Sequence, residues 1–265
     1  MLSLTKGIYL GTIEKSICDD DIIACLTSYN EAESYKKMHC HENPHISFVL
    51  AGGNLEKRKN GQIERLPGKI TFYYSGENHQ SIDILNFSKH INLELKQRFI
   101  TEYRINEGTL AYAIAKNPDA KFLLLRIYKE LTTDDEISAI SIRMLLLELL
   151  NHSMYFQEKE KNHSWVNIVD EILRNNLYQQ WSLNYLSTIV QMHPVTVSRQ
   201  FHKYYSCTLG EYVRKLKIEK ALTLIKTSQN SLTEIAFECG FADQSHFIRT
   251  FKRLTGLLPH IYQKM

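Results

Sequence analysis

SLNYLSTIVQMHPVTVSRQFHKYYSCTL (residues 182–209) decides the fold, because a degenerate copy of it, SLTEIAFECGFADQSHFIRTFKRLTGLL, follows at residues 231–258. Each copy holds a short apolar helix, a turn, and a second helix with an Arg, a Phe and further basic residues. Arg199 and Arg249 lie 50 residues apart, at corresponding places in the two copies. The repeat therefore predicts two helix-turn-helix units, which would present two recognition helices to one DNA duplex.

The first copy has the apolar spacing and the turn residues of such a unit. Its first helix is expected to bury Leu186, and its turn falls at residues 191–193. Pro194 suits the first position of the next helix, where its missing N–H is not needed. We expect Val197 and Phe201 to face the core. The candidates for DNA contact on this helix are Val195, Thr196, Ser198, Arg199, His202 and Lys203.

The second copy follows the same plan with different turn residues. Gly240 begins its turn, and Asp243 is a good N-cap for a helix over residues 244–254. We expect Phe247 and Phe251 to be buried. The residues left on the outer face, which are candidates for DNA contact, are Gln244, Ser245, His246, Arg249 and Lys252.

The predicted outer faces have the chemistry of DNA readout. An α-helix fits the major groove, where Arg, Gln, Ser and Thr can hydrogen-bond to base edges, whereas Lys more often binds phosphate. Residues 210–227 read as one amphipathic helix between the units, about 27 Å long at ~1.5 Å per residue. A spacer of this length would set the two recognition helices near one DNA turn apart, roughly 34 Å. If Lys215 and Lys217 on this helix contact phosphate, their replacement by Ala should weaken binding to all DNA sequences and flatten its salt dependence.

Composition and charge agree with a two-domain protein of this kind. The chain has 265 residues, a length typical of two domains, and residues 164–265 carry 12 Lys or Arg against seven Asp or Glu. Five scattered cysteines without a C-x-x-C motif favour reduced thiols in a cytoplasm. The N-terminus lacks the apolar stretch of a signal peptide, and no apolar run is long enough to span a membrane. We therefore expect a cytoplasmic protein that does not enter a membrane.

The N-terminal part is expected to be an antiparallel β-barrel followed by helices. Short apolar runs alternate with turn residues up to about residue 105, and Asn60-Gly61 suggests a hairpin. A helical pattern follows, in which Thr133 is a plausible start for a helix over residues 133–156. The wide apolar face of that helix fits either a dimer contact or plain core packing. We predict an N-terminal domain over residues 1–156, a linker at 157–164 and an all-α domain over 165–265, with helix-turn-helix units at about 183–203 and 232–254.

The C-terminal segment resembles the DNA-binding domain of AraC-family transcription regulators. The matching stretches include WSLNYLS, SRQF, LGEYV, KIEKAL and LTEIAFECGFADQSHFIRTFKRLTG, and they cover about 85 residues. The resemblance implies base contacts from two groups of four residues. His193 stands where the family has a capping Ser, and Lys217 replaces the common Arg of the linker helix. The implied groups are Val195, Thr196, Ser198 and Arg199, and Gln244, Ser245, His246 and Arg249.

Histidines in the N-terminal part resemble the two motifs of the cupin barrel, in which three His and a Glu hold a metal. His39, His41 and His45, followed by Gly52, match the first motif, and Gly68, Gly76 and His79 the second, with His45 in the Glu position. AraC-family sensor domains look like cupins but mostly hold a small organic effector, so the same histidines are candidates for an effector pocket. The effector-binding candidates are His39, His41, His45, Phe48, Tyr74 and His79. The metal alternative uses His39, His41, His45 and His79.

These features favour a sequence-specific DNA-binding transcription regulator that is not an enzyme and needs no cofactor. Its expected partners are double-stranded promoter DNA, a small-molecule effector, a second copy of the chain and, for an activator, RNA polymerase. The main alternative is a metal-dependent cupin enzyme with a DNA-binding tail. A second alternative is an effector-free regulator whose N-terminal domain binds only another protein.

Overall fold

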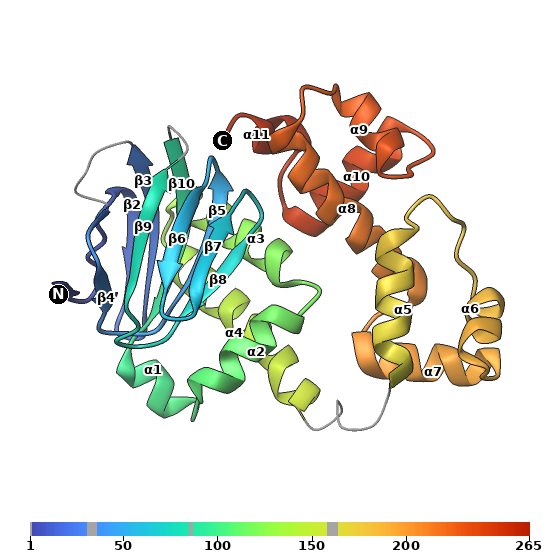
Figure 1. The fold of residues 1–265 in the computed structure, drawn as a ribbon, viewed down its shortest axis with the longest axis horizontal. Helices are drawn as coiled ribbons and strands as arrows, with labels where there is room; N and C mark the ends of the chain where they lie inside the picture. The colour runs from blue at the N-terminus through green and yellow to red at the C-terminus, as the bar shows by residue number, and fades with distance from the viewer. Residues whose placement is uncertain (1, 31–35, 85–86, 158–163) are drawn as a thin grey trace. The chain divides into compact units, whose positions relative to one another are not determined.

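The computed structural model describes residues 2–30, 36–84, 87–157 and 164–265 (Figure 1). The chain divides into two compact units, Met1–Ser153 and Met154–Lys264, and the division falls inside one helix. A strand-rich first unit with following helices and an all-helical second unit confirm the predicted fold class. The predicted linker, residues 157–164, falls largely outside the described residues. In the described part of the chain, no helix is both long enough and apolar enough to cross a membrane.

The first unit is built on two five-stranded sheets. One sheet has the order β1-β4-β9-β6-β7 and the other β2-β3-β10-β5-β8, and in the described residues every pairing of neighbouring strands is antiparallel except that of β1 with β4. Double sheets of this kind leave only short edges and include the cupins. The strands are β1 (Leu2–Leu4), β2 (Thr12–Cys18), β3 (Ile22–Asn30), β4 (His39–His41), β5 (His45–Ala51), β6 (Asn54–Arg58), β7 (Gly61–Arg65), β8 (Ile70–Tyr73), β9 (His79–Ile84) and β10 (Phe87–Leu95).

Pairing register brings the histidines of distant segments together. His39 on β4 lies opposite His79 on β9, and His45 on β5 lies opposite Tyr73 on β8. The predicted hairpin is present and joins β6 to β7, but its two-residue turn is Lys59-Asn60 and Gly61 is the first residue of β7. Because side chains alternate along a strand, every second residue of β4, β5, β6, β9 and β10 faces the space between the sheets.

Four helices follow the strands: α1 (Gln97–Glu102), α2 (Glu107–Lys116), α3 (Ala120–Thr133) and α4 (Ser138–Gln157). Helix α3 contacts β2 and β3, while α2 contacts β8. The prediction that a helix begins at Thr133 is wrong, because Thr133 is the last residue of α3. Asp134 takes a left-handed conformation (φ 53°) that ends α3, and the Asp135 carboxylate accepts hydrogen bonds from the Ile137 amide and the Ser138 hydroxyl at the start of α4.

The second unit is all-helical. Its helices are α5 (Ser164–Asn175), α6 (Leu183–Val190), α7 (Pro194–Tyr205), α8 (Leu209–Thr227), α9 (Leu232–Glu238), α10 (Gln244–Thr255) and α11 (Pro259–Gln263). Helix α8 contacts α7, α9, α10 and α11 (Figure 1). It therefore forms the shared support for both predicted helix-turn-helix units.

Candidate functional site

The first helix-turn-helix unit is α6 and α7 with the turn that the sequence predicts. Ser182 caps α6 by accepting a hydrogen bond from the Tyr185 amide, and Gln191 ends the helix in a left-handed conformation (φ 52°). His193, at the place of the family's capping Ser, caps α7 through its side chain, which accepts from the Val195 amide at 3.3 Å. The His193 imidazole is thus the hydrogen-bond acceptor at this N-cap, where the family has a Ser hydroxyl.

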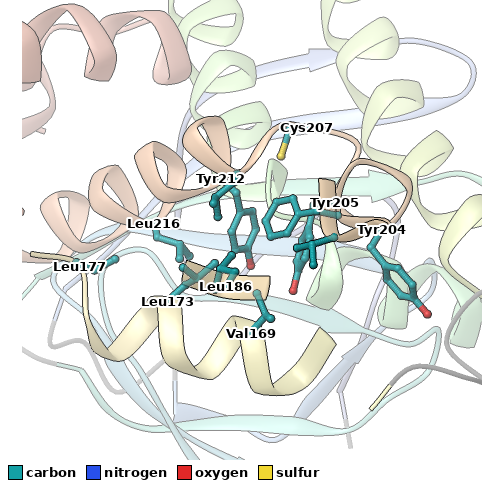
Figure 2. Close-up of a cluster of buried hydrophobic side chains, with 12 residues drawn as sticks. Val169, Leu173, Leu177, Leu186, Tyr204, Tyr205, Cys207, Tyr212 and Leu216 are labelled. Carbon is teal, nitrogen blue, oxygen red and sulfur yellow. The ribbon is translucent and has the colours of Figure 1, made fainter. Parts of the chain in front are cut away.

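An aromatic and aliphatic core holds this unit on α5 and α8 (Figure 2). Val169 and Leu173 of α5 lie beneath Leu186 of α6, while Tyr205 and Tyr212 close the cluster from α7 and α8. The Tyr212 hydroxyl also donates a hydrogen bond to Asp170 on α5. Desolvation together with that carboxylate raises the pKa of Tyr212, so the hydroxyl keeps its proton. The core therefore fixes α7 from its buried side and leaves the opposite face open.

The second helix-turn-helix unit consists of α9 and α10, and side chains cap both of its helices. Ser231 and Glu234 form a capping box at the start of α9, and Asp243 caps α10 by accepting from the His246 amide at 2.7 Å. Gly240 makes the turn at φ 76°, where a Cβ would approach the Leu177 carbonyl oxygen to 2.9 Å. Only glycine fits this turn without strain.

The exposed faces of α7 and α10 carry the predicted DNA-contact residues. Val197 and Phe201, like Phe247 and Phe251, are buried, so the polar positions between them face solvent. Val195, Ser198, Arg199, His202 and Lys203 are exposed on α7, with Thr196 half-buried. On α10, Ser245, Arg249 and Lys252 are exposed, while Gln244 and His246 are half-buried. The His246 ring packs on Phe241 at 5.3 Å between centroids, which orients it against the turn.

A basic groove between α8 and α10 was not predicted. Arg214 of α8 and Arg249 and Arg253 of α10 line a hollow of about 380 Å³ together with His246 and Thr250. The Nε atom of Arg214 is buried without a hydrogen-bond partner in the structure. The helical repeat could not reveal Arg214 and Arg253, because the groove joins residues of two helices that are far apart in sequence.

Phosphate contact by Lys215 and Lys217 is not supported by their surroundings. Lys215 is buried, and Lys217 donates a hydrogen bond to the Gly240 carbonyl oxygen. Burial also lowers the pKa of Lys217. The Lys217 side chain therefore links α8 to the turn between α9 and α10.

A cavity of about 30 Å³ lies between the two sheets of the first unit. Polar side chains from both sheets line it, and four of the six predicted effector residues are among them. This volume is far below the ~300–1,000 Å³ of sites for drug-sized ligands and is close to the room that one or two waters need. The lining residues are Tyr9, Leu10, Tyr29, His39, His41, His45, Ser47, Asn54, Glu56, Arg65, Tyr73, His79, Ser81, Ser88, His90 and Asn92.

Three of these histidines converge. His39, His41 and His79 are buried, and one possible ligand atom from each lies within 4.8 Å of the others. Burial is the largest cause that lowers the pKa of all three, to about 3 for His41 and about 2 for His79. Their imidazoles are therefore neutral near pH 7, which is the form that binds metal ions.

The convergent group does not include His45, although the metal alternative did and although the His45 ring centroid lies 4.3 Å from that of His41. The His45 ring stacks on Tyr73 with centroids 4.3 Å apart and an angle of 8° between the planes. The Tyr73 hydroxyl donates to Glu56 at 2.5 Å, and Glu56 is paired with Arg65 at 3.4 Å. A chain of buried contacts thus holds His45 against β8. In the described residues, the convergent group contains three histidines and not four.

Phe48 and Tyr74 do not line the cavity, contrary to the prediction. Alternation along β5 places His45 and Ser47 on the cavity side and Phe48 on the opposite, buried face. Strand β8 ends at Tyr73, and Tyr74 beyond it is 43% exposed. Tyr73 takes the place in the cavity that was expected of Tyr74.

A segment from the N-terminus covers the histidines. The Tyr9 ring lies 5.3 Å from that of His41 and 6.0 Å from that of His45. Glu94, buried on β10, accepts hydrogen bonds from the Gly7 amide at 2.8 Å and from the Asn43 side chain at 2.7 Å. No motif in the sequence signals this contact, because it joins residues 87 positions apart.

Comparison with known proteins gives a consistent result. Residues 186–265 match a family described as "Helix-turn-helix domain". The chain is 25% identical over 236 residues to the probable transcriptional regulator LumQ of Photobacterium leiognathi, covering 86% of this chain and 92% of LumQ. It is 24% identical to the HTH-type transcriptional regulator YobQ of Bacillus subtilis (88% and 92% covered) and 25% identical to the transcriptional activator RhaS of an Enterobacter species (66% and 63%). These relatives are named as regulators, which favours a regulator over the enzyme alternative.

Proposed function

We propose, from the membership of this chain in the AraC family of DNA-binding transcription regulators, that α7 and α10 enter the major groove of promoter DNA and that the first unit controls this binding. DNA-binding transcription regulation is the function of the family. For this chain we propose which residues contact the bases and where a controlling ligand binds.

The observation that carries the proposal is the matching pair of exposed helix faces. In each helix-turn-helix unit, two buried residues four positions apart anchor the second helix. An exposed Arg lies between them in sequence, Arg199 on α7 and Arg249 on α10. An Arg on a helix in the major groove binds the O6 and N7 atoms of guanine through two hydrogen bonds. Base contacts are therefore assigned to Val195, Thr196, Ser198 and Arg199, and to Gln244, Ser245, His246 and Arg249.

Phosphate contacts are assigned to the cations beside these residues. His202 and Lys203 extend the exposed face of α7, and Lys252 that of α10. The groove with Arg214 and Arg253 has the charge and the width for a phosphate group of the DNA backbone. These contacts would hold the register of the protein on DNA without reading sequence.

Control by the first unit requires a ligand with different affinities for two states of the protein. The polar cavity between the sheets, closed by Tyr9, is the place for such a ligand. A dimer is proposed through α4, where Ile137, Ile140 and Met144 are 62%, 65% and 62% exposed on or just before one helix face. The occupant of that face would be the same face of a second copy, since most homo-oligomers are symmetric dimers.

The test is selection of fragmented genomic DNA of the source organism by the purified chain at near-physiological salt, followed by sequencing. We expect enrichment of a few sites that contain two half-elements about one turn, ~10 bp, apart. The matched control carries Arg199→Ala and Arg249→Ala, and it should lose the enrichment while keeping salt-sensitive retention. Equal enrichment by both proteins would overturn the assignment of base contacts to α7 and α10.

A further inference from the structure

The cavity in the first unit has the residues of a metal site in place of those of an organic pocket. We propose that His39, His41 and His79 bind one first-row transition-metal ion, and that this ion is the ligand that controls DNA binding. The controlling role rests on the proposed function, whereas the metal site itself stands on the geometry of the three histidines.

Two of the imidazoles are already oriented for a metal ion. Nδ1 of His39 lies 2.8 Å from the Lys37 carbonyl oxygen, and Nδ1 of His79 lies 3.0 Å from the Glu77 carbonyl oxygen. A carbonyl oxygen only accepts, so each Nδ1 carries the hydrogen and each Nε2 has a free lone pair. Metal-binding histidines characteristically donate their second N–H in this way.

His41 supplies an independent sign of a missing partner. Its Nδ1, like that of His45, is buried and has no hydrogen-bond partner, although buried polar atoms are nearly always paired. Its ring centroid lies 5.3 Å from that of His39 and 5.5 Å from that of His79. Bonds of ~2.0–2.1 Å to a tetrahedral ion place ligand nitrogens about 3.4 Å apart, so modest rotations of the three rings complete the site.

The volume and the donor set select the class of ligand. A cavity of about 30 Å³ has room for an ion with a water molecule and is far smaller than the ~300–1,000 Å³ of sites for drug-sized ligands. Three neutral imidazoles suit Zn²⁺, Ni²⁺, Cu²⁺ or Fe²⁺. Cys40 lies between His39 and His41 in sequence, but alternation along β4 turns its side chain to the other face of the strand, and it is not among the cavity residues.

The segment around Tyr9 links the ion to the rest of the unit. Because Tyr9 packs on the His41 ring, an ion that fixes His41 also fixes the surface on which this segment lies. Glu94 ties the segment to β10 through the Gly7 amide, and Lys6 beside it is exposed. Metal binding is therefore expected to protect the peptide bond after Lys6 from trypsin.

The first experiment measures metal binding by the full chain, purified without a His-tag and freed of metal with a chelator. Zn²⁺ and Co²⁺ are titrated in competition with a chromophoric chelator. We expect one ion per chain, and His39→Asn, His41→Asn and His79→Asn should each weaken binding by at least the ~10–100-fold that loss of an outer-shell partner costs. His45→Asn and His90→Asn are the matched controls from the same cavity and should stay within a few-fold. The absence of stoichiometric binding, or equal loss in His45→Asn, would overturn the three-histidine site.

A second readout needs no variant and so is not affected by misfolding. Co²⁺ bound to the unaltered chain should give visible d–d bands without the near-ultraviolet band of a thiolate ligand. A thiolate band would place Cys40 in the site and overturn the assignment. Faster trypsin cleavage after Lys6 in the metal-bound chain would contradict the role of Tyr9.

The third measurement separates the metal proposal from the proposed function. Affinity for a selected DNA site is compared with and without Zn²⁺, in the unaltered chain and in His79→Asn. We expect a change of about 5–150-fold in the unaltered chain, as is usual for coupled sites, and none in His79→Asn. Unchanged specific binding with metal at the histidines would overturn the controlling role alone. A metal-binding chain that shows no specific DNA binding in either state would overturn the proposed function and leave the metal site intact.

Discussion

The two units of this protein both bury apolar side chains but differ in the polar groups that they bury beside them. The helical unit buries aliphatic and aromatic residues such as Leu186, Tyr205 and Tyr212 (Figure 2), and its proposed DNA-contact arginines, Arg199 and Arg249, are exposed. The sheet unit buries histidines and the Glu56–Arg65 ion pair between its sheets. Apolar burial stabilises a fold directly, whereas buried polar groups cost desolvation energy unless they are paired. Among the described residues, the buried histidines all belong to the sheet unit, and its apolar core does not account for them.

The largest expected effect is on the apolar core of the helical unit. Phe201→Ala should lower the free energy of unfolding by about 3–5 kcal/mol, because the side chain is fully buried and its loss leaves a cavity. Phe237→Ala is the matched control, since Phe237 is 54% exposed, and it should change stability by less than about 0.5 kcal/mol. Urea unfolding followed by tryptophan fluorescence measures this unit selectively, because both tryptophans, Trp165 and Trp181, belong to it. Similar losses in the two variants would refute the apolar-core account.

Removing one partner of the buried Glu56–Arg65 ion pair should lower the stability of the sheet unit strongly, whereas replacing both partners by uncharged residues should lower it little. Arg65→Met leaves the buried Glu56 with only the longer, 3.7 Å ion pair to Arg58 and should destabilise the unit by about 3 kcal/mol. Adding Glu56→Gln removes the second charge, keeps an acceptor for the Tyr73 hydroxyl, and should recover most of the loss. Hydrogen exchange of β6–β8 peptides measures the effect, with Lys59→Met as an exposed control. A double variant as unstable as Arg65→Met would mean that the pair itself supports the fold.

Acid should destabilise the metal-free sheet unit before the helical unit. The pKa of His41 is lowered to about 3 and that of His79 to about 2, from a usual value of 6.5, mainly by burial. Below about pH 6.5 the unfolded chain takes up protons on these imidazoles while the folded chain does not, so stability is complete above this pH and falls as pH falls. Each histidine contributes about 1.4 kcal/mol per pH unit between its two pKa values. Hydrogen exchange should show that the strands are less protected at pH 5 than at pH 7. If protection is lost only in α5–α11, the helical unit is the acid-sensitive one and the prediction is wrong.

The smallest effects on stability should come from the DNA-contact residues. Arg199→Ala and Arg249→Ala should each weaken specific DNA binding by ~1–3 kcal/mol while changing the free energy of unfolding by less than about 0.5 kcal/mol, because both side chains are exposed. Fluorescence anisotropy on a selected site measures the first quantity and urea unfolding the second. Lys59→Ala, an exposed cation in the other unit, is the control and should leave specific binding unchanged. A large loss of stability in either Arg variant would mean that this side chain supports the fold, and it would contradict the account of an exposed residue used for DNA contact.

Local patterns were sufficient to predict the helical unit. The spacing of Val197, Phe201, Phe247 and Phe251 predicted which faces of α7 and α10 are buried, and Pro194 and Asp243 marked where these helices begin. Such signals depend only on neighbours along the chain, within one or two turns of helix. Prediction was incomplete where the deciding contact is distant, as for Lys217, whose partner at Gly240 lies 23 residues away.

The sheet unit was predicted less completely for the same reason. Its class followed from turn residues and the four cavity histidines from the resemblance to the cupin motifs, but Phe48 and Tyr74 were assigned to the wrong face. A shift of one position along a strand reverses the side that a side chain faces, and the end of β8 after Tyr73 is not marked in the sequence. Tyr9, Glu56, Arg65 and Glu94 carry no motif and were missed.

The sequence by itself determined that this protein has two helix-turn-helix units and which residues they expose, because helix periodicity and capping are local. Only the tertiary structure decided that His39, His41 and His79 converge without His45. Strand pairing brings β4 and β9 together across the chain, whereas the His45 ring stacks on Tyr73 and is not part of the convergent group. Pairing between distant strands is set by the packing of the whole unit, and no short stretch of sequence contains it.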